Sequence, residues 1–220
     1  MSLLSSSFKK LTLSSLAAGI SIGIACIAFL KTGNAWVFPI GLFMVCYFGF
    51  HLYTGRICYA EKLIDAPDLV WMLFMNIVGA ALLGVITHFV YPELAQKATE
   101  LAVAKINEDW QVFPRAILCN IMIFVAVECW KDYSPDNINK IKFQDKTIIH
   151  LHNPVKFFGL IFATAIFVIC GFEHCVANAF YFGCAFNHDV NVLWYIPANI
   201  LGNTIGGIAA YRATKYVRGW

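Results

Sequence analysis

The stretch GFEHCVANAFY occupies residues 171–181, inside an apolar run that extends over 155–186. Glu173, His174 and Asn178 stand in this stretch, where a plain transmembrane helix would carry apolar side chains. The run is also longer than the roughly 20 residues that a helix needs to cross a bilayer. Irregular backbone at membrane depth survives only where it faces protein or a water-filled cavity. The stretch therefore predicts a broken transmembrane helix with a functional site at the break.

A second stretch, GFHLYTGRICY at 49–59, resembles the first and lies in another overlong apolar run, 35–60. LFMNIVGA at 73–80 likewise resembles ILGNTIGG at 200–207, at a nearly equal offset along the chain. A repeat unit with an odd number of spans is inverted relative to its partner, and inverted repeats with broken helices are a transport architecture. We expect two inverted three-helix repeats with broken second and fifth helices. Their bounds are 11–91 and 113–217.

The composition excludes a soluble protein. Hydrophobic residues make up 60% of the 220 residues and charged residues only 13%, whereas a soluble domain carries about 25% charged residues. The fold class is therefore all-α and integral to the membrane, as a single transmembrane channel domain over residues 1–220. Six transmembrane helices are predicted from runs of suitable length. They are 11–30, 35–60, 69–91, 113–130, 155–186 and 190–217.

The basic residues favour cytoplasmic termini. With the N-terminus inside, twelve of the sixteen Lys and Arg residues fall on the inner side, as the positive-inside rule expects. The only long polar segment, 131–154, is then a cytoplasmic loop. Lys9 and Lys10 precede the first span, whose length favours a retained helix over a signal peptide. We take the cell (plasma) membrane as the location, and the net charge of +3 is too small and scattered to indicate nucleic acid.

The cysteines and loop histidines indicate neither disulfides nor metal. All eight cysteines lie in or beside apolar stretches without CxxC spacing, which predicts reduced, buried thiols. His150 and His152 share the polar loop without Cys or carboxylate partners at ligand spacing. The sequence predicts no metal and no cofactor.

His174 is the strongest single candidate, because ionisable residues inside a membrane are costly and usually functional. A buried neutral histidine that a neighbouring helix satisfies is the alternative interpretation. Glu173 points to another side of the helix and is expected to support the break. An intramembrane enzyme that pairs His174 with Cys175 is disfavoured, because adjacent residues on a helix do not face each other.

Asn76 and Asn203 each stand three residues before a pair of small residues, Gly79-Ala80 and Gly206-Gly207. Small residues let helices approach closely, and a buried Asn can bond across the contact. We interpret both as packing residues that support the helix breaks, as we do Asn178. A pore-lining role is the alternative.

Four motifs in order resemble the formate/nitrite transporter family. GFEHCVANAFYF (171–182) is similar to the Gly-Phe-Glu-His-x-x-Ala-Asn hallmark of its fifth span. The other three are similar to its second, fourth and sixth spans: PIGLFMVCYFGFHLYTG (39–55), RAILCNIMIFVAVECW (115–130) and IPANILGNTIGG (196–207). The resemblance implies a homopentamer of aquaporin-like protomers, each with its own pore for a small anion, and not an enzyme.

The resemblance also implies roles for single residues. His174 matches the central pore histidine, Thr54 the loop threonine that faces it, and Asn120 a residue that braces this centre. Lys105 stands near the outer mouth, where the family has a lysine. The apolar matches are Phe38, Leu42 and Phe167 for an outer constriction, and Leu52 and Tyr53 for an inner one. Three positions depart from the family pattern: His51 for an acidic residue, Tyr53 for Phe, and Arg56 for a small or polar residue.

The residues suggest how an anion crosses. Burying an unpaired carboxylate costs several kcal/mol, so a dry constriction passes a weak acid more readily once it is neutral. His174 is the group able to exchange a proton near neutral pH. We expect it to protonate the anion, with protons and the lipid bilayer as the other partners.

Formate and nitrite lead as substrates, and hydrosulfide, acetate and lactate stay open. An intramembrane enzyme, a pore for water or neutral solutes, and a non-conducting assembly protein are the alternatives from other classes.

Overall fold

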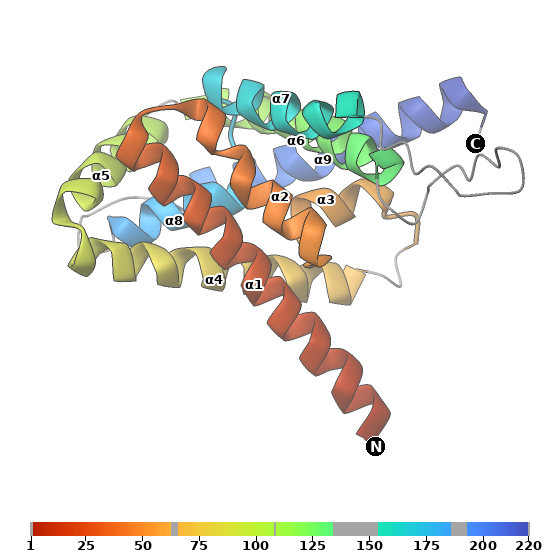
Figure 1. The fold of residues 1–220 in the computed structure, drawn as a ribbon, viewed down its shortest axis with the longest axis horizontal. Coiled ribbons are helices and arrows are strands. Elements are labelled where there is room, and N and C mark those ends of the chain that lie inside the picture. Colours follow the sequence, from red (N-terminus) through yellow and green to blue (C-terminus); the bar gives the residue numbers. More distant parts are fainter. Residues whose placement is uncertain (1, 63–65, 108, 134–153, 186–192, 220) are drawn as a thin grey trace, which may run out of the picture.

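The computed structural model describes residues 2–62, 66–107, 109–133, 154–185 and 193–219, and every regular element within them is helical (Figure 1). The longer helices are α1 (Ser2–Thr32), α4 (Ala66–Val90), α5 (Pro92–Ile106), α6 (Val112–Tyr133), α7 (Pro154–Ile169) and α9 (Tyr195–Arg218). The shorter ones are η1 (Ala35–Val37), α2 (Pro39–Phe48), α3 (Tyr53–Arg56), η2 (Ile57–Tyr59), η4 (Asp109–Gln111) and α8 (Cys175–Cys184).

Three helical segments within the described ranges are long and apolar enough to cross a bilayer, namely Ser7–Thr32, Ala66–Val90 and Val112–Lys131. A fourth crossing results if Ala35–Phe48 and Tyr53–Tyr59, which meet at a bend of 65°, form one span. The all-α prediction agrees with this architecture, and the number of six spans stays a prediction. The predicted loop 131–154 lies almost entirely outside the described residues.

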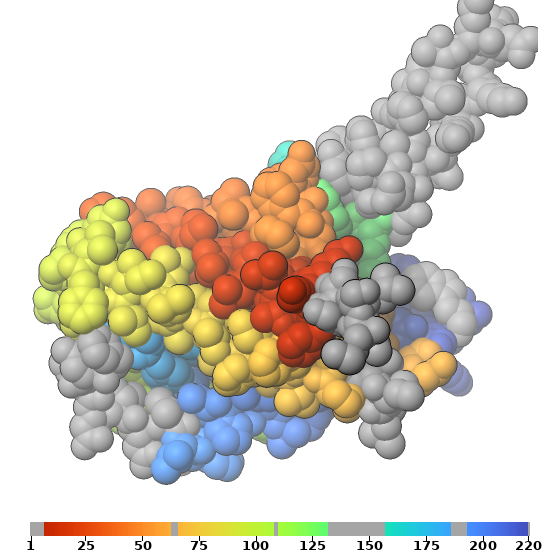
Figure 2. All heavy atoms as spheres, turned by 90° about the horizontal axis from the view of Figure 1, so that it is seen from below, coloured from red at the N-terminus to blue at the C-terminus, as the bar shows by residue number. Residues whose placement is uncertain are grey.

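The helices pack in two long pairs. α1 runs along α4 (Figures 1 and 2). α6 runs along α9, with α7 on the other side of α6 (Figure 1). The short helix α8 lies across α4, and η2 lies against α9. α5 covers one end of the molecule, and both chain termini lie toward the other end (Figure 1).

Each long pair is in backbone contact at a glycine. A Cβ atom on Gly79 of α4 would overlap the carbonyl oxygen of Leu16 on α1, and one on Gly206 of α9 would overlap that of Ile117 on α6. Both glycines stand three residues after the asparagine of their helix. Small residues at such crossings let the two backbones approach, so the predicted Asn-x-x-Gly segments lie at helix contacts.

Substituting Gly206 by Ala will destabilise the protein by about 1–3 kcal/mol, because the added methyl must push α9 away from α6. The measurement is thermal unfolding in detergent. Gly55→Ala is the matched control, since a Cβ there meets Val127 Cγ2 at an ordinary 3.5 Å. Equal melting temperatures for the two variants would contradict the close contact.

Two chain breaks interrupt the helices, and both are built alike. α2 is followed by Gly49 at φ 68° and α7 by Gly171 at φ 64°, a backbone region that favours glycine. The next residue then bonds back into the preceding helix: Phe50 N–H donates to Val45 O, and Phe172 N–H to Phe167 O, both at 2.9 Å. The helices therefore end at fixed points, and extended backbone follows.

At each break, an asparagine side chain on one helix forms hydrogen bonds to the backbone of the break and to a second helix. Asn76 Oδ1 accepts from Tyr53 N–H at 2.7 Å, the first residue of α3, while Nδ2 donates to His51 O and to Ser15 O of α1. Asn203 Oδ1 accepts from Cys175 N–H at 2.9 Å, the first residue of α8, while Nδ2 donates to Glu173 O and Ala116 O of α6. Unpaired backbone groups are costly in a dry interior, and these amides satisfy them.

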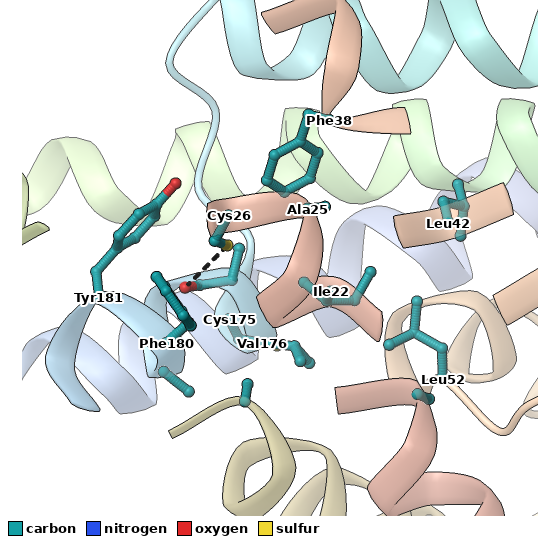
Figure 3. Close-up of a cluster of buried hydrophobic side chains, with 14 of the residues drawn as sticks. Ile22, Ala25, Cys26, Phe38, Leu42, Leu52, Cys175, Val176, Phe180 and Tyr181 are labelled. Atoms are coloured by element: carbon teal, nitrogen blue, oxygen red, sulfur yellow. Dashed lines mark hydrogen bonds between the residues drawn. The ribbon is translucent and has the colours of Figure 1, made fainter. Parts of the chain in front are cut away.

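The apolar core fills the space between α1, α2 and α8. Ile22, Ala25, Phe38, Val176 and Phe180 are buried there (Figure 3). The Cys26 thiol of α1 donates to the Ala177 carbonyl at 3.9 Å. All eight cysteines are free thiols. This core holds the start of α8 in place beside α1.

Candidate functional site: a histidine between two cavities

The first cavity lies at the α5 end of the molecule and has a volume of about 130 Å³. We call it the Lys105 cavity. Its polar lining comes from Lys105, His174, Asn178 and Tyr181. Its apolar lining is Phe29, Phe38, Leu101, Phe167, Val168, Gly171, Phe172 and Ala177. The predicted central histidine therefore borders a cavity that also presents a lysine.

The second cavity lies where α4 begins and α6 ends, and it measures about 570 Å³. We call it the Arg56 cavity. Arg56, Lys131 and Asp68 supply its charged lining. The other lining residues are Leu42, Val45, Cys46, Gly49, Phe50, Leu52, Gly55, Tyr59, Ala60, Leu69, Met72, Val127 and Trp130.

Apolar side chains close the facing walls of the two cavities. Phe38 and Phe167 border the Lys105 cavity, with ring centroids 5.4 Å apart and planes nearly perpendicular. The Phe167 ring also stacks on the His174 ring at 5.8 Å. Leu42 and Leu52 border the Arg56 cavity instead, each at most 2% exposed (Figure 3). Leu42, expected in an outer constriction with Phe38, thus lies on the wall of the other cavity.

His174 precedes α8 as its N-cap, and both of its ring nitrogens are occupied. Nδ1 accepts from the Ala177 N–H at 3.2 Å, and Nε2 lies 3.0 Å from Thr54 Oγ1. Because Nδ1 accepts a backbone donor, the proton of the neutral ring is on Nε2 and points to Thr54. The Thr54 hydroxyl has no second partner among the described residues, so its own proton is left to donate. The fold thus brings together Thr54 and His174, which are 120 residues apart in the sequence.

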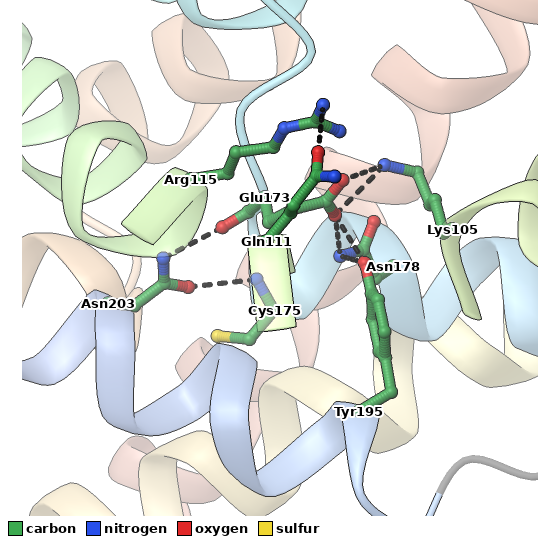
Figure 4. Close-up of polar contacts among 8 residues, drawn as sticks. All are labelled: Lys105, Gln111, Arg115, Glu173, Cys175, Asn178, Tyr195 and Asn203. Carbon is green, nitrogen blue, oxygen red and sulfur yellow. Dashed lines mark hydrogen bonds and ion pairs between the residues drawn. The ribbon is translucent and has the colours of Figure 1, made fainter. Parts of the chain in front are cut away.

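Glu173 lies behind the cavity wall in a dense polar network (Figure 4). Its carboxylate is 1% exposed and accepts from Lys105 Nζ at 2.7 and 2.9 Å. Asn178 Nδ2 donates to it at 2.7 Å, and the Tyr195 hydroxyl donates as well. Lys105 borders the cavity while Glu173 does not. The ammonium therefore faces the cavity with its counter-charge directly behind it.

The remaining predicted residues lie around this centre. Asn120 is fully buried and contacts Cys58 Sγ at 3.8 Å, and Cys58 in turn donates to Thr54 O. The Asn120 Oδ1 atom has no hydrogen-bond partner among the described residues. Tyr53 directs its hydroxyl to Thr204 Oγ1 of α9 at 2.8 Å. Tyr53 thus contacts the long helix α9 and Asn120 the short helix η2, and neither borders one of the two cavities.

Sequence reasoning missed three groups at the site. Tyr195 looks like an ordinary apolar-span aromatic, and only its hydroxyl could have signalled a buried partner. Lys131 and Asp68 were not singled out from the sequence, yet both border the Arg56 cavity. Within the described ranges, no group of three or more His, Cys, Asp and Glu side chains is placed to hold a metal ion.

Residues 1–141 match the sequence model described as formate/nitrite transporter. The chain belongs to this family. The predicted resemblance is confirmed, and the family is one of transporters, in agreement with the prediction that the chain is not an enzyme. Family membership and the long apolar helices make the chain a multi-pass membrane protein.

Two curated members of the family are similar in sequence. The formate channel FocA of Haemophilus influenzae is 30% identical over 202 residues, covering 76% of this chain and 63% of the relative. The formate channel BtFdhC of Bacillus thuringiensis is 28% identical over 192 residues, covering 78% of this chain and 66% of the relative. The chain thus spans slightly less than two thirds of the length of these relatives.

Two solved structures share the fold. One, a pentameric formate channel with formate bound, superposes with a TM-score of 0.73 at 22% identity, covering 94% of this chain and 95% of that chain. The other, an FNT family ion channel, gives 0.76 at 22% identity, covering 98% and 92%. The all-helical fold is therefore that of the family's channels.

Proposed function

We propose that the protein is a membrane channel for a small monovalent weak-acid anion, formate or nitrite, with transient protonation of the anion at His174. One observation carries the proposal. The His174 ring borders the Lys105 cavity and is bonded to Thr54 of α3, whose neighbours Leu52, Gly55 and Arg56 border the Arg56 cavity. The same hydrogen-bonded pair thus stands between two cavities that apolar side chains separate.

The proposed topology has six spans in two inverted halves. α1, α4, α6 and α9 are single spans, α2 with α3 and η2 forms the broken second span, and α7 with α8 the broken fifth. Neither α7, with 16 residues, nor α8, with 10, reaches across a bilayer alone. Two pairs of equivalent contacts support the repeat: the hydrogen bonds of Asn76 and Asn203 to the breaks, and the backbone contacts at Gly79 and Gly206.

The proposed assembly is a homopentamer with one pathway in each protomer. It rests on the fold shared with a pentameric formate channel. Both termini are proposed to be cytoplasmic, in the plasma membrane, so that the Lys105 cavity faces outward and the Arg56 cavity inward. The even number of proposed spans and the shared end of the two termini support their lying on one side of the membrane (Figure 1). The excess of Lys and Arg in the inner segments supports the cytoplasm as that side.

The proposed route begins at Lys105. Two of its three ammonium protons are engaged by Glu173, which leaves one for an anion in the cavity. For the transfer, His174 takes up a solvent proton on Nδ1, which gives up the bond from the Ala177 N–H. The imidazolium then transfers one N–H proton to an oxygen of the anion and returns to the neutral ring. The N–H bond breaks as the O–H bond forms, and the neutral acid crosses the wall of Leu42 and Leu52, where a bare anion would lose its hydration. Release of the proton on the far side restores the anion.

Hydrosulfide, acetate and lactate remain alternatives within the same family. The Lys105 cavity has a volume of only about 130 Å³, which favours the smaller of these acids as substrates. An intramembrane enzyme has less support, because the ring nitrogens of His174 face Thr54 Oγ1 and the Ala177 N–H and not the Cys175 thiol.

A liposome flux panel tests the function. Reconstituted protein is assayed with formate, nitrite, hydrosulfide, acetate and chloride at two pH values. We expect flux of formate or nitrite that rises on acidification, because at lower pH more of the imidazole and more of the anion carry a proton. Chloride should pass poorly, since it cannot be neutralised at neutral pH. Rapid chloride flux without pH dependence would refute the protonation scheme.

A further inference from the structure

Arg56 is an uncompensated charge at the Arg56 cavity. Its side chain is exposed at the end of α3 and borders the cavity. No carboxylate of the described residues lies within ion-pair distance of its guanidinium. Its backbone N–H is already used, since it donates to Leu52 O at 3.0 Å. Among the described residues its guanidinium has no hydrogen-bond partner either, so its N–H donors are left for a ligand.

Of the other two charged residues that border the cavity, Lys131 has an ion-pair partner and Asp68 stands at a helix N-terminus. Lys131 Nζ lies 3.1 Å from Glu128 Oε1 and 3.2 Å above the centre of the Tyr59 ring. Asp68 stands in the first turn of α4, where the helix N-terminus stabilises a carboxylate. Of the two cations among the described lining residues, Arg56 is thus the one without a carboxylate within ion-pair distance, and the low-dielectric walls of the cavity concentrate its field.

A guanidinium suits one class of anion. It presents N–H donors in a planar fork that pairs with two oxygens of a carboxylate at once. Formate, acetate and nitrite each present two oxygens in one plane. Chloride and hydrosulfide do not. Leu42 and Leu52 form the apolar wall of the same cavity, so an anion that leaves the barrier meets Arg56 next.

We propose that the Arg56 cavity is a second anion-holding site, in which the Arg56 guanidinium binds formate, nitrite or another anion with two coplanar oxygens. The inference rests on the proposed function and narrows its substrate class. A site here raises the local concentration of the anion at the inner face and favours two-oxygen anions over spherical ones. His174 alone provides no such discrimination, since protonation requires only a weak acid.

Trp130 borders the same cavity and is a built-in probe. Its fluorescence, obtained as the difference between the wild type and Trp130→Phe, is quenched with iodide and, separately, with neutral acrylamide. In Arg56→Gln we expect the iodide quenching constant of Trp130 to fall about two- to five-fold while the acrylamide constant is unchanged, because only a charged quencher responds to the guanidinium. Formate should protect Trp130 from iodide in the wild type and less well in Arg56→Lys, which keeps the charge but loses the fork.

Arg212→Gln is the matched control, because Arg212 is an exposed arginine of α9 that does not border the cavity. It should leave both quenching constants unchanged. An iodide constant that is equal in the wild type and Arg56→Gln would overturn the proposal, as would formate protection that survives in Arg56→Gln.

Flux measurements separate this site from the channel function. In reconstituted protein, Arg56→Gln should raise the half-saturating formate concentration about three-fold or more when formate is added at the inner face, and leave the outer-face value unchanged. If the wild type shows no flux but Arg56 controls iodide access to Trp130, the channel proposal fails and the anion site stands. If flux is normal but Arg56→Gln changes neither quenching nor half-saturation, the anion site fails alone.

Discussion

Replacing His174 by Asn will reduce formate flux by about 100-fold or more while the protein still folds, because a barrier raised by about 3 kcal/mol corresponds to such a factor. Asn is chosen because it is a favoured N-cap residue and can accept the Ala177 N–H that His174 Nδ1 accepts now. The variant thus keeps the start of α8 and removes the titratable ring. The measurement is formate uptake into liposomes, with internal acidification recorded in parallel.

His174→Phe supplies the comparison, since it removes both the titratable imidazole and the N-cap acceptor of α8. We expect both variants to lose acid-stimulated flux and only His174→Phe to lose thermal stability as well. If His174→Asn transports formate at the wild-type rate with the same pH dependence, the proton-donor role is wrong. If instead flux falls but keeps its wild-type pH dependence, the ring acts only as a neutral hydrogen-bond donor to Thr54.

Replacing Lys105 by Met will destabilise the protein by about 3–5 kcal/mol, because it leaves a buried carboxylate without its counter-charge. Glu173 is 1% exposed and would retain only Asn178 and Tyr195 as donors. Thermal unfolding in detergent measures the loss. The double variant Lys105→Met with Glu173→Gln should recover most of the stability, since the charge and its partner are then removed together.

Formate uptake distinguishes two roles of Lys105, the pairing with Glu173 and the attraction of an anion into the cavity. The double variant should stay poor in formate uptake even though it is stable, because no cation then faces the cavity. Lys31→Met is the control, since it breaks an exposed ion pair with Glu93, in which the side chains are 63% and 56% exposed. It should change neither property. Full formate uptake by the double variant would show that Lys105 serves only the fold.

Much of the site was predictable from sequence because the membrane makes polar residues rare. Glu173, His174 and Asn178 stand out in an apolar run, and the glycines before each break mark where a helix must end. The placement of Asn76 and Asn203 at helix contacts also agrees with the spacing of the small residues that follow them. Family membership is confirmed from the same motifs.

Other features were missed, one of them despite a local pattern. No helix was predicted over 92–106, yet Leu94, Ala95, Ala98 and Ala102 form a buried stripe on α5, at the spacing of an amphipathic helix. The other features depend on tertiary contacts. Tyr195 was indistinguishable from a core aromatic. The assignment of Leu42 to one cavity or the other depends on how α2 tilts at its bend of 65°, which no local sequence pattern specifies.

The hydrogen bonds of Asn76 and Asn203 make the positions of the two chain breaks depend on the long helices behind them. Asn76 ties Tyr53 to α1 and α4, and Asn203 ties Cys175 to α6 and α9. When the tilt of one helix pair changes, the break that is bonded to this pair moves with it. The His174 imidazole therefore shifts relative to the Thr54 hydroxyl. Bilayer thickness is a physical variable that tilts such helices, so we expect the lipid environment to act on the proposed permeation through these two amides.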